Sequence, residues 1–122
     1  MKHKLLIVDD QPGIRMLLSD ILQTKGYEVE EAQTGKEAID KVNQTSYDLI
    51  ILDYKLPVVD GAQFIEYLNT NRINSRIILM SGLVENISKE IKKCDIVKEI
   101  VAKPFNVNDF YDIVKRTLSV KQ

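Results

Sequence analysis

Short runs of apolar residues alternate along the chain with longer stretches in which apolar residues recur at helical spacing. This alternation is typical of repeated strand–helix units, and five such units fit the sequence. Most of the short runs are apolar without alternation, as expected for parallel strands covered on both faces, whereas residues 27–32 alternate and carry three glutamates. The predicted strands are residues 4–8, 27–32, 48–52, 76–80 and 99–102, with the second at an edge of the sheet.

The stretches between these strands predict helices. The first has the most regular pattern, with apolar residues at positions 14, 17, 18, 21 and 22 and an end at Gly26. Thr34 (with Glu37), Asp60 and Asn106 are capping residues predicted to open the second, third and fifth helices. The fourth, residues 84–93, has few apolar residues among lysines, so we expect it to be the least firmly docked and the most mobile element.

These elements predict an α/β fold, a doubly wound five-stranded parallel sheet with five helices. Only residues 119–122 follow the last predicted helix, so we expect residues 1–122 to form a single domain with no output domain. In such folds ligands bind outside the carboxyl ends of the strands, where the strand order reverses.

Composition excludes several classes of function. A formal net charge of -1 gives no basic field for binding nucleic acid. The longest aliphatic runs are far too short to span a membrane and no signal peptide is visible, so a cytoplasmic protein is expected. The chain has a single cysteine, Cys94, and a single histidine, which excludes an internal disulfide and a Cys/His zinc site.

Polar residues follow four of the five predicted strands, and only the edge strand contributes none. They are Asp9 and Asp10, Asp53, Ser81 and Lys103. Each has an ordinary explanation as a helix cap, a loop or turn residue or a solvated lysine, but parallel strands should bring all five to one edge of the sheet. Three carboxylates in one crevice repel each other unless a cation holds them, and all-oxygen ligands suit magnesium. The pattern therefore predicts a divalent-metal site that would also offset the charge of a phosphoryl group.

Four segments containing these residues, VDDQ, ILDYKLPVVDG, MSG and AKPF, together resemble the receiver domain of bacterial two-component response regulators. The resemblance covers the whole chain. It implies a flavodoxin-like strand order of 2-1-3-4-5. Within the family, the chain is most similar to stand-alone regulators of the sporulation phosphorelay, which makes sporulation a candidate pathway.

The resemblance implies that Asp53 is the phosphoacceptor, which attacks a phosphohistidine on a partner to form an aspartyl phosphate. Magnesium, with manganese as a second candidate, would be held by the side chains of Asp10 and Asp53. The backbone carbonyl of Lys55 would be a further ligand, and Asp9 would bind through water.

Other positions carry further implied roles. Lys103 would pair with a phosphoryl oxygen, followed by a cis peptide bond to Pro104. Ser81 would donate its hydroxyl to the phosphoryl group after transfer and draw the following loop inward. The family often has an aromatic residue three positions before the lysine, but here that position is Ile100, which puts aromatic gating in doubt.

The implied partners are a histidine kinase and a histidine phosphotransfer protein, with an aspartyl-phosphate phosphatase as a further candidate. We expect a monomer that is a signalling phosphoacceptor and not an enzyme. The apolar stripe of the first helix is wider than core packing needs, which leaves an apolar edge beside Asp10 for a helical partner. The predicted docking residues are Gln11, Gly13, Ile14, Leu17, Pro104 and Phe105.

Three alternatives remain open on the sequence. A phosphatase of the haloacid dehalogenase type also uses an aspartate nucleophile after a strand, but it needs a second acid where this chain has Lys55. A flavodoxin-like FMN carrier would need a phosphate loop where Asp9 and Asp10 stand. A degenerate receiver would signal by binding alone, although every group of the acceptor site is present.

Overall fold

The computed structural model describes residues 2–119. Within them, five parallel strands form one sheet in the order β2-β1-β3-β4-β5, as predicted. The strands are β1 (Lys4–Val8), β2 (Glu28–Ala32), β3 (Leu49–Asp53), β4 (Arg76–Ser81) and β5 (Val97–Ala102). β3 and β4 each run one residue further than predicted, because Asp53 and Ser81 keep their register with Met80 and Ala102. Both polar residues thus belong to the sheet itself.

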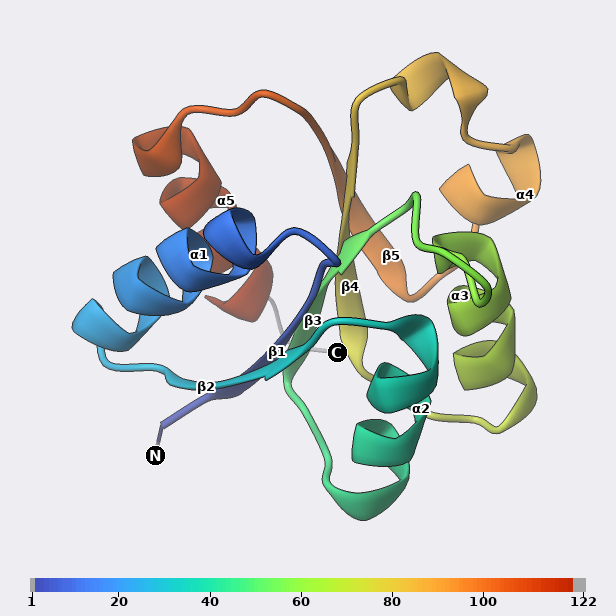
Figure 1. The fold of residues 1–122 in the computed structure, drawn as a ribbon, viewed down its shortest axis with the longest axis horizontal. Helices are drawn as coiled ribbons and strands as arrows, with labels where there is room; N and C mark the ends of the chain where they lie inside the picture. Colours follow the sequence, from blue (N-terminus) through green and yellow to red (C-terminus); the bar gives the residue numbers. More distant parts are fainter. Residues whose placement is uncertain (1, 120–122) are drawn as a thin grey trace.

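Helices cover both faces of the sheet (Figure 1). The helical segments are α1 (Pro12–Thr24), α2 (Gly35–Gln44), α3 (Gly61–Thr70), η1 (Val84–Asn86), α4 (Lys89–Lys92) and α5 (Val107–Ser119). α1 and α5 lie on one face of the sheet, and the largest fully buried side chain there is Phe110. α2, α3 and α4 lie on the other face, and the largest fully buried side chain there is Phe64. In the described part of the chain, no helix has the length and apolar character of a membrane span.

The predicted caps open their helices. Asp60 and Gln63 form a complete capping box at α3, with hydrogen bonds of 2.8 and 2.9 Å. Thr34 accepts the N–H of Glu37 at 3.0 Å, but the Glu37 carboxylate accepts the N–H of Gln33 and not that of Thr34. At α5, Asn106 accepts two backbone N–H groups of the first turn, those of residues 108 and 109.

The fourth helical segment is shorter than predicted. Residues 84–93 divide into the 3-10 turn η1 and the single turn α4, separated by extended backbone at Ile87. Ile87 is almost fully buried, and Ser88 starts α4 by accepting the N–H of Ile91 at 3.3 Å. The anchoring of Ile87 and the new cap at Ser88 explain why one helix does not run through. Of the predicted tail, Ser119 is the last residue of α5, and residues 120–122 lie outside the described part of the chain.

The loop between β3 and α3 holds one residue in a strained conformation. Val58 has a φ of 66°, a region that β-branched residues avoid, and the residue is 96% exposed. The backbone at the next residue, Val59, lies close to Gly35, because a Cβ on Gly35 would lie 2.4 Å from the Val59 carbonyl oxygen. A Cβ on Gly61 would lie 2.7 Å from the Cα of Tyr54. Close backbone approaches therefore flank Val58 on both sides of the loop.

Val58→Gly is expected to stabilise the protein by about 1 kcal/mol. The left-handed conformation costs a β-branched residue more free energy than glycine costs by making the unfolded chain more flexible. The Val58 side chain is exposed, so its removal loses little buried apolar surface. Urea unfolding followed by circular dichroism measures the difference. Val59→Gly is the matched control, since Val59 is half-buried and should only lose stability. A Val58→Gly protein less stable than wild type would show that the strain is absent.

Candidate functional site

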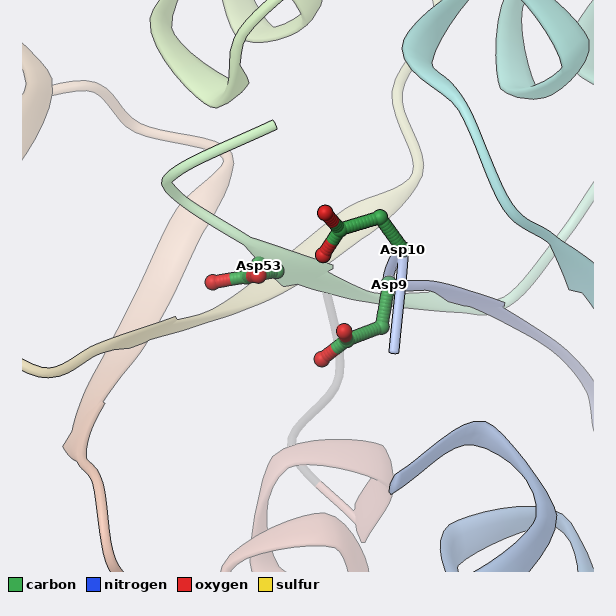
Figure 2. Close-up of side chains that lie close together, drawn as sticks. All are labelled: Asp9, Asp10 and Asp53. Atoms are coloured by element: carbon green, nitrogen blue, oxygen red, sulfur yellow. The ribbon is translucent and has the colours of Figure 1, made fainter. Parts of the chain in front are cut away.

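Three carboxylates meet at the carboxyl end of the sheet. Asp9 and Asp10 follow β1, and Asp53 ends the neighbouring β3. Each offers one oxygen, and these oxygens lie within 4.8 Å of one another (Figure 2). Asp9 is fully buried and Asp53 is 6% exposed, whereas Asp10 is exposed. The predicted convergence of the three aspartates is confirmed.

Asp9 is held at several of its polar atoms. Its backbone N–H donates to the carbonyl of Ala32 on β2 at 3.1 Å, and its Oδ1 accepts the N–H of Gln11 at 2.9 Å. The turn that follows leads into α1, whose N-cap is Gln11 with Pro12 at the start of the helix. Asp10 is therefore not the helix cap, so the ordinary explanation for its position fails.

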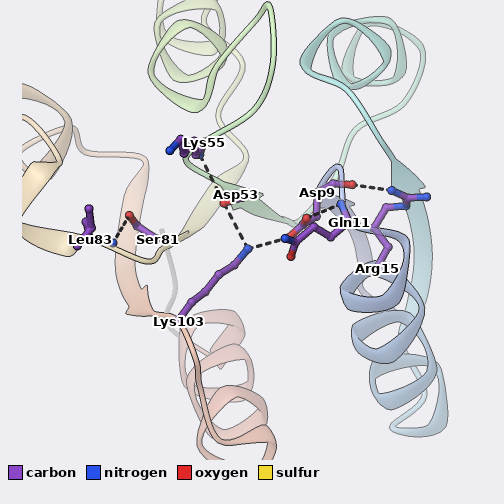
Figure 3. A network of polar contacts seen from close by, with 8 residues as sticks. All are labelled: Asp9, Gln11, Arg15, Asp53, Lys55, Ser81, Leu83 and Lys103. Carbon is purple, nitrogen blue, oxygen red and sulfur yellow. Dashed lines mark hydrogen bonds and ion pairs between the residues drawn. The ribbon is translucent and has the colours of Figure 1, made fainter.

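Lys103 joins the two buried carboxylates (Figure 3). Its Nζ lies 3.2 Å from Asp9 Oδ2 and 3.4 Å from Asp53 Oδ1, and its side chain is 18% exposed. Its backbone N–H donates to the Ser81 carbonyl at 2.8 Å, and its bond to Pro104 is cis, as the resemblance implies. A solvated surface lysine would make neither of the two carboxylate contacts, so the side chain of Lys103 lies within the acidic cluster.

The environment of Asp53 disfavours its charge. Burial raises the pKa of the Asp53 carboxyl, and the nearby charge of Asp9 raises it further. The Lys103 ammonium and the backbone N–H of Lys55, 3.4 Å from Asp53 Oδ1, lower the pKa but do not cancel the rise. A further cation beside Asp53 would favour the ionised carboxylate.

The donor set fits magnesium. Receiver domains bind Mg²⁺ at a cluster of aspartates, and this chain has such a cluster in Asp9, Asp10 and Asp53. Mg²⁺ takes oxygen ligands, and the three carboxylate oxygens lie within 4.8 Å of one another, so one ion would reach all three, directly or through a bound water. All three groups are hard oxygen donors, which suits Mg²⁺ better than a soft metal.

Ser81 has an ordinary turn contact in this structure. Its Oγ accepts the N–H of Leu83 at 3.1 Å, and the residue is almost fully buried at the end of β4. A hydroxyl that accepts one hydrogen bond can still donate its own proton. Ile100, at the position that is often aromatic, packs half-buried against the core on the α3 and α4 side of the sheet.

An open cleft lies over the Asp53 carboxylate. Its lining includes the predicted Asp10, Gln11, Asp53, Lys55 and Lys103 together with Leu56, Pro57 and Gly82. The last three were not predicted, and they have no charge that would mark them; their place directly after Lys55 and Ser81 is the only signal in the sequence. A fourth unpredicted residue, Arg15, contacts Asp9 from α1.

The predicted docking residues divide into two groups. Ile14 and Phe105 are half-buried and pack against the core under α1 and α5, with the Phe105 ring stacked on Phe110 at 5.2 Å. Leu17 is 47% exposed, so this part of the predicted apolar stripe faces solvent and not the core. The remaining members are exposed: Gln11, Gly13 and Pro104.

Comparison with known proteins gives one family. The model of the response regulator receiver domain matches residues 5–115. The sporulation initiation phosphotransferase F of Bacillus subtilis is 36% identical over 122 residues, which cover 99% of this chain and 98% of that protein. The chemotaxis protein CheY of the same organism is 32% identical over 121 residues, 98% of this chain and all of that one.

Solved structures show the same fold. The receiver domain of a LuxO repressor protein from Vibrio parahaemolyticus superposes with a TM-score of 0.87 at 26% identity, covering 97% of this chain and 91% of that one. The response regulator TrrA of Thermotoga maritima, solved in complex with Mg(2+)-BeF, gives 0.81 at 33% identity and covers 96% and 99%. Both likenesses extend over nearly the full length of each chain.

Proposed function

The chain belongs to the response regulator receiver domain family, and on that premise we propose that it accepts a phosphoryl group on Asp53 from a phosphohistidine. Receiver domains are phosphoacceptor signalling modules and not classical enzymes. The observation that carries the proposal is the convergence of Asp53 with Asp9, Asp10 and Lys103 at the end of the sheet. Because the chain belongs to this family, we set aside the phosphatase and the flavin-carrier alternatives.

The proposed step is a displacement at phosphorus. A carboxylate oxygen of Asp53 forms a bond to phosphorus as the bond between phosphorus and the histidine nitrogen breaks, and the imidazole leaves with that electron pair. The Lys103 ammonium, 3.4 Å from Asp53 Oδ1, is placed to pair with a phosphoryl oxygen as charge gathers there. The same Lys103 offsets the charge of the buried Asp9, which lies 3.2 Å from its Nζ.

Asp10, Asp53 and the carbonyl of Lys55 would hold the metal, with Asp9 bound through water. Mg²⁺, or Mn²⁺ as a second candidate, offsets the charge of the phosphoryl oxygens when it is bound. The structure of the Thermotoga relative in complex with Mg(2+)-BeF supports the choice of Mg²⁺ as the metal. The open cleft over Asp53 leaves room for the donor group to approach.

After transfer, Ser81 would donate its hydroxyl proton to a phosphoryl oxygen. Its Oγ now accepts the N–H of Leu83, so a shift of Ser81 toward Asp53 would pull on the loop that leads to η1. Leu83 is 55% exposed, which leaves this loop little packing to resist the movement. This movement is the proposed signal.

The proposed partners follow from the named relatives and the exposed surface. The likeness to a sporulation initiation phosphotransferase supports transfer from a histidine kinase and onward to a histidine phosphotransfer protein, with sporulation as the candidate pathway. A helical partner would dock along α1, where Leu17 offers an exposed apolar contact, and reach Asp53 past Gln11, Gly13 and Pro104. An aspartyl-phosphate phosphatase would bind the same face. We propose that the protein acts as a monomer in the cytoplasm.

Labelling tests the proposal. Purified protein is incubated with acetyl phosphate, or with a phosphorylated histidine phosphotransfer protein, and its intact mass is measured. We expect one phosphoryl group from either donor with Mg²⁺ and none in the presence of a chelator. Protein that binds Mg²⁺ but is labelled by neither donor would instead be a degenerate receiver that signals by binding alone.

A further inference from the structure

Arg15 connects three elements beside the acidic cluster. It lies in the first turn of α1, and its side chain is only 14% exposed. Its Nη1 donates to the backbone carbonyl of Asp9 at 2.7 Å (Figure 3). Its Nε lies 3.3 Å from Oε1 of Glu31 on β2. The guanidinium therefore holds the end of β1 and is itself held by the edge strand.

The Asp9 carbonyl oxygen, which Arg15 contacts, bears on the orientation of the Asp10 side chain. The Asp9 carbonyl belongs to the planar peptide that joins Asp9 to Asp10, so a bond to this oxygen fixes the plane from which the Asp10 side chain projects. The other polar groups of Asp9 are held by Ala32, Gln11 and Lys103. Asp10 is exposed, so packing does little to orient its carboxylate.

We propose that Arg15 is a positioning residue that aims the Asp10 carboxylate at the metal site, with Glu31 orienting the guanidinium. This inference rests on the proposed function only in taking Mg²⁺ as the ligand. It also gives the edge strand, from which the sequence predicts no contribution, an indirect part in the site. Loss of the hydrogen bonds that orient metal ligands changes metal affinity by about 10-fold to 100-fold, and because Arg15 acts on Asp10 through the peptide that joins it to Asp9, we expect the lower end of this range.

Positioning and simple electrostatics predict opposite results. Arg15 carries a positive charge close to the aspartates, so its removal would tighten Mg²⁺ binding if charge alone mattered. If Arg15 positions Asp10, its removal weakens binding instead. Lysine keeps the charge but lacks the planar fork that reaches two partners at once, so Arg15→Lys separates the two effects further.

The test is calorimetric titration of the full chain with Mg²⁺ alone, without a phosphoryl donor. We expect the dissociation constant to rise about 10-fold in Arg15→Met and nearly as much in Arg15→Lys, because both lose the fork. Glu31→Gln should give a smaller rise, since the guanidinium keeps its bond to the carbonyl. Arg116→Met is the matched control, because Arg116 pairs with Glu99 at 2.7 Å on the surface of α5 and β5, and its affinity should equal that of wild type.

The second readout is labelling by acetyl phosphate over a range of Mg²⁺ concentrations. Positioning shifts the Mg²⁺ concentration that gives half-maximal labelling, while the rate at saturating Mg²⁺ stays near that of wild type. Binding by folded Arg15→Met and Arg15→Lys as tight as wild type or tighter would overturn the inference, as would a wild type that binds no Mg²⁺. Wild type that binds Mg²⁺ without being labelled would overturn the proposed function alone.

Discussion

Asp53→Ala is expected to abolish phosphorylation of the protein by acetyl phosphate and by a histidine phosphotransfer donor. The substitution removes the carboxylate that ends β3 beneath the cleft and lies 3.4 Å from the Lys103 ammonium. Intact mass should show no added phosphoryl group under conditions that label wild type. Asp112→Ala, which removes an exposed carboxylate from α5, is the matched control and should be labelled normally. Undiminished labelling of Asp53→Ala would place the acceptor elsewhere.

The same position has a predicted effect on stability. The pKa of Asp53 is raised in the folded state by burial and by Asp9, so the folded protein keeps this proton to higher pH than the unfolded chain does. Stability should therefore fall as pH rises from the ordinary value toward the raised one, and the loss is complete above it. Asp53→Asn cannot ionise, so in a chelator at neutral pH it should melt higher than wild type.

Two comparisons check the cause of that difference. The stability advantage of Asp53→Asn should vanish at a pH below the ordinary aspartate pKa, where Asp53 is protonated in both states of the wild type. Added Mg²⁺ should stabilise wild type more than the variant, since a bound cation favours the ionised carboxylate. An advantage that persists unchanged in acid would point to packing and not to charge.

Lys103→Met is expected to slow labelling by about 100-fold to 1000-fold, because the ammonium is the protein cation placed to meet charge on the phosphoryl group. Binding of Mg²⁺ should become tighter, because Asp9 and Asp53 lose the positive charge that lies between them. Labelling kinetics and calorimetry measure the two effects separately. Their opposite signs distinguish a role in the transfer from a role in metal binding.

Lys98→Met is the control for this change, since Lys98 is exposed on the same strand. It should alter neither the labelling rate nor the affinity for Mg²⁺. Without Lys103, two buried carboxylates face each other, so the variant should also be less stable in a chelator. A Lys103→Met protein labelled within a few-fold of the wild-type rate would remove Lys103 from the proposed transfer.

Local pattern was enough for most of the fold. The continuous apolar runs of β1, β3 and β4 mark strands covered on both faces, and the caps Thr34, Asp60 and Asn106 open their helices at the predicted places. The fourth helix was predicted too long. Its three apolar residues fit helical spacing, but the burial of Ile87 in extended backbone takes precedence over that spacing.

The order of residues along the chain was sufficient to place the chemical groups at the strand ends. Parallel strands in βα units all point their carboxyl ends the same way, so Asp9, Asp10, Asp53, Ser81 and Lys103 had to share an edge once the strands were recognised. Tertiary structure decided how these groups pair. The 3.2 and 3.4 Å contacts of Lys103, the bond from Arg15 to the Asp9 carbonyl and the link from Arg15 to Glu31 join residues on different elements. Distances between elements depend on how helices and strands pack against each other, and no local spacing in the chain encodes them.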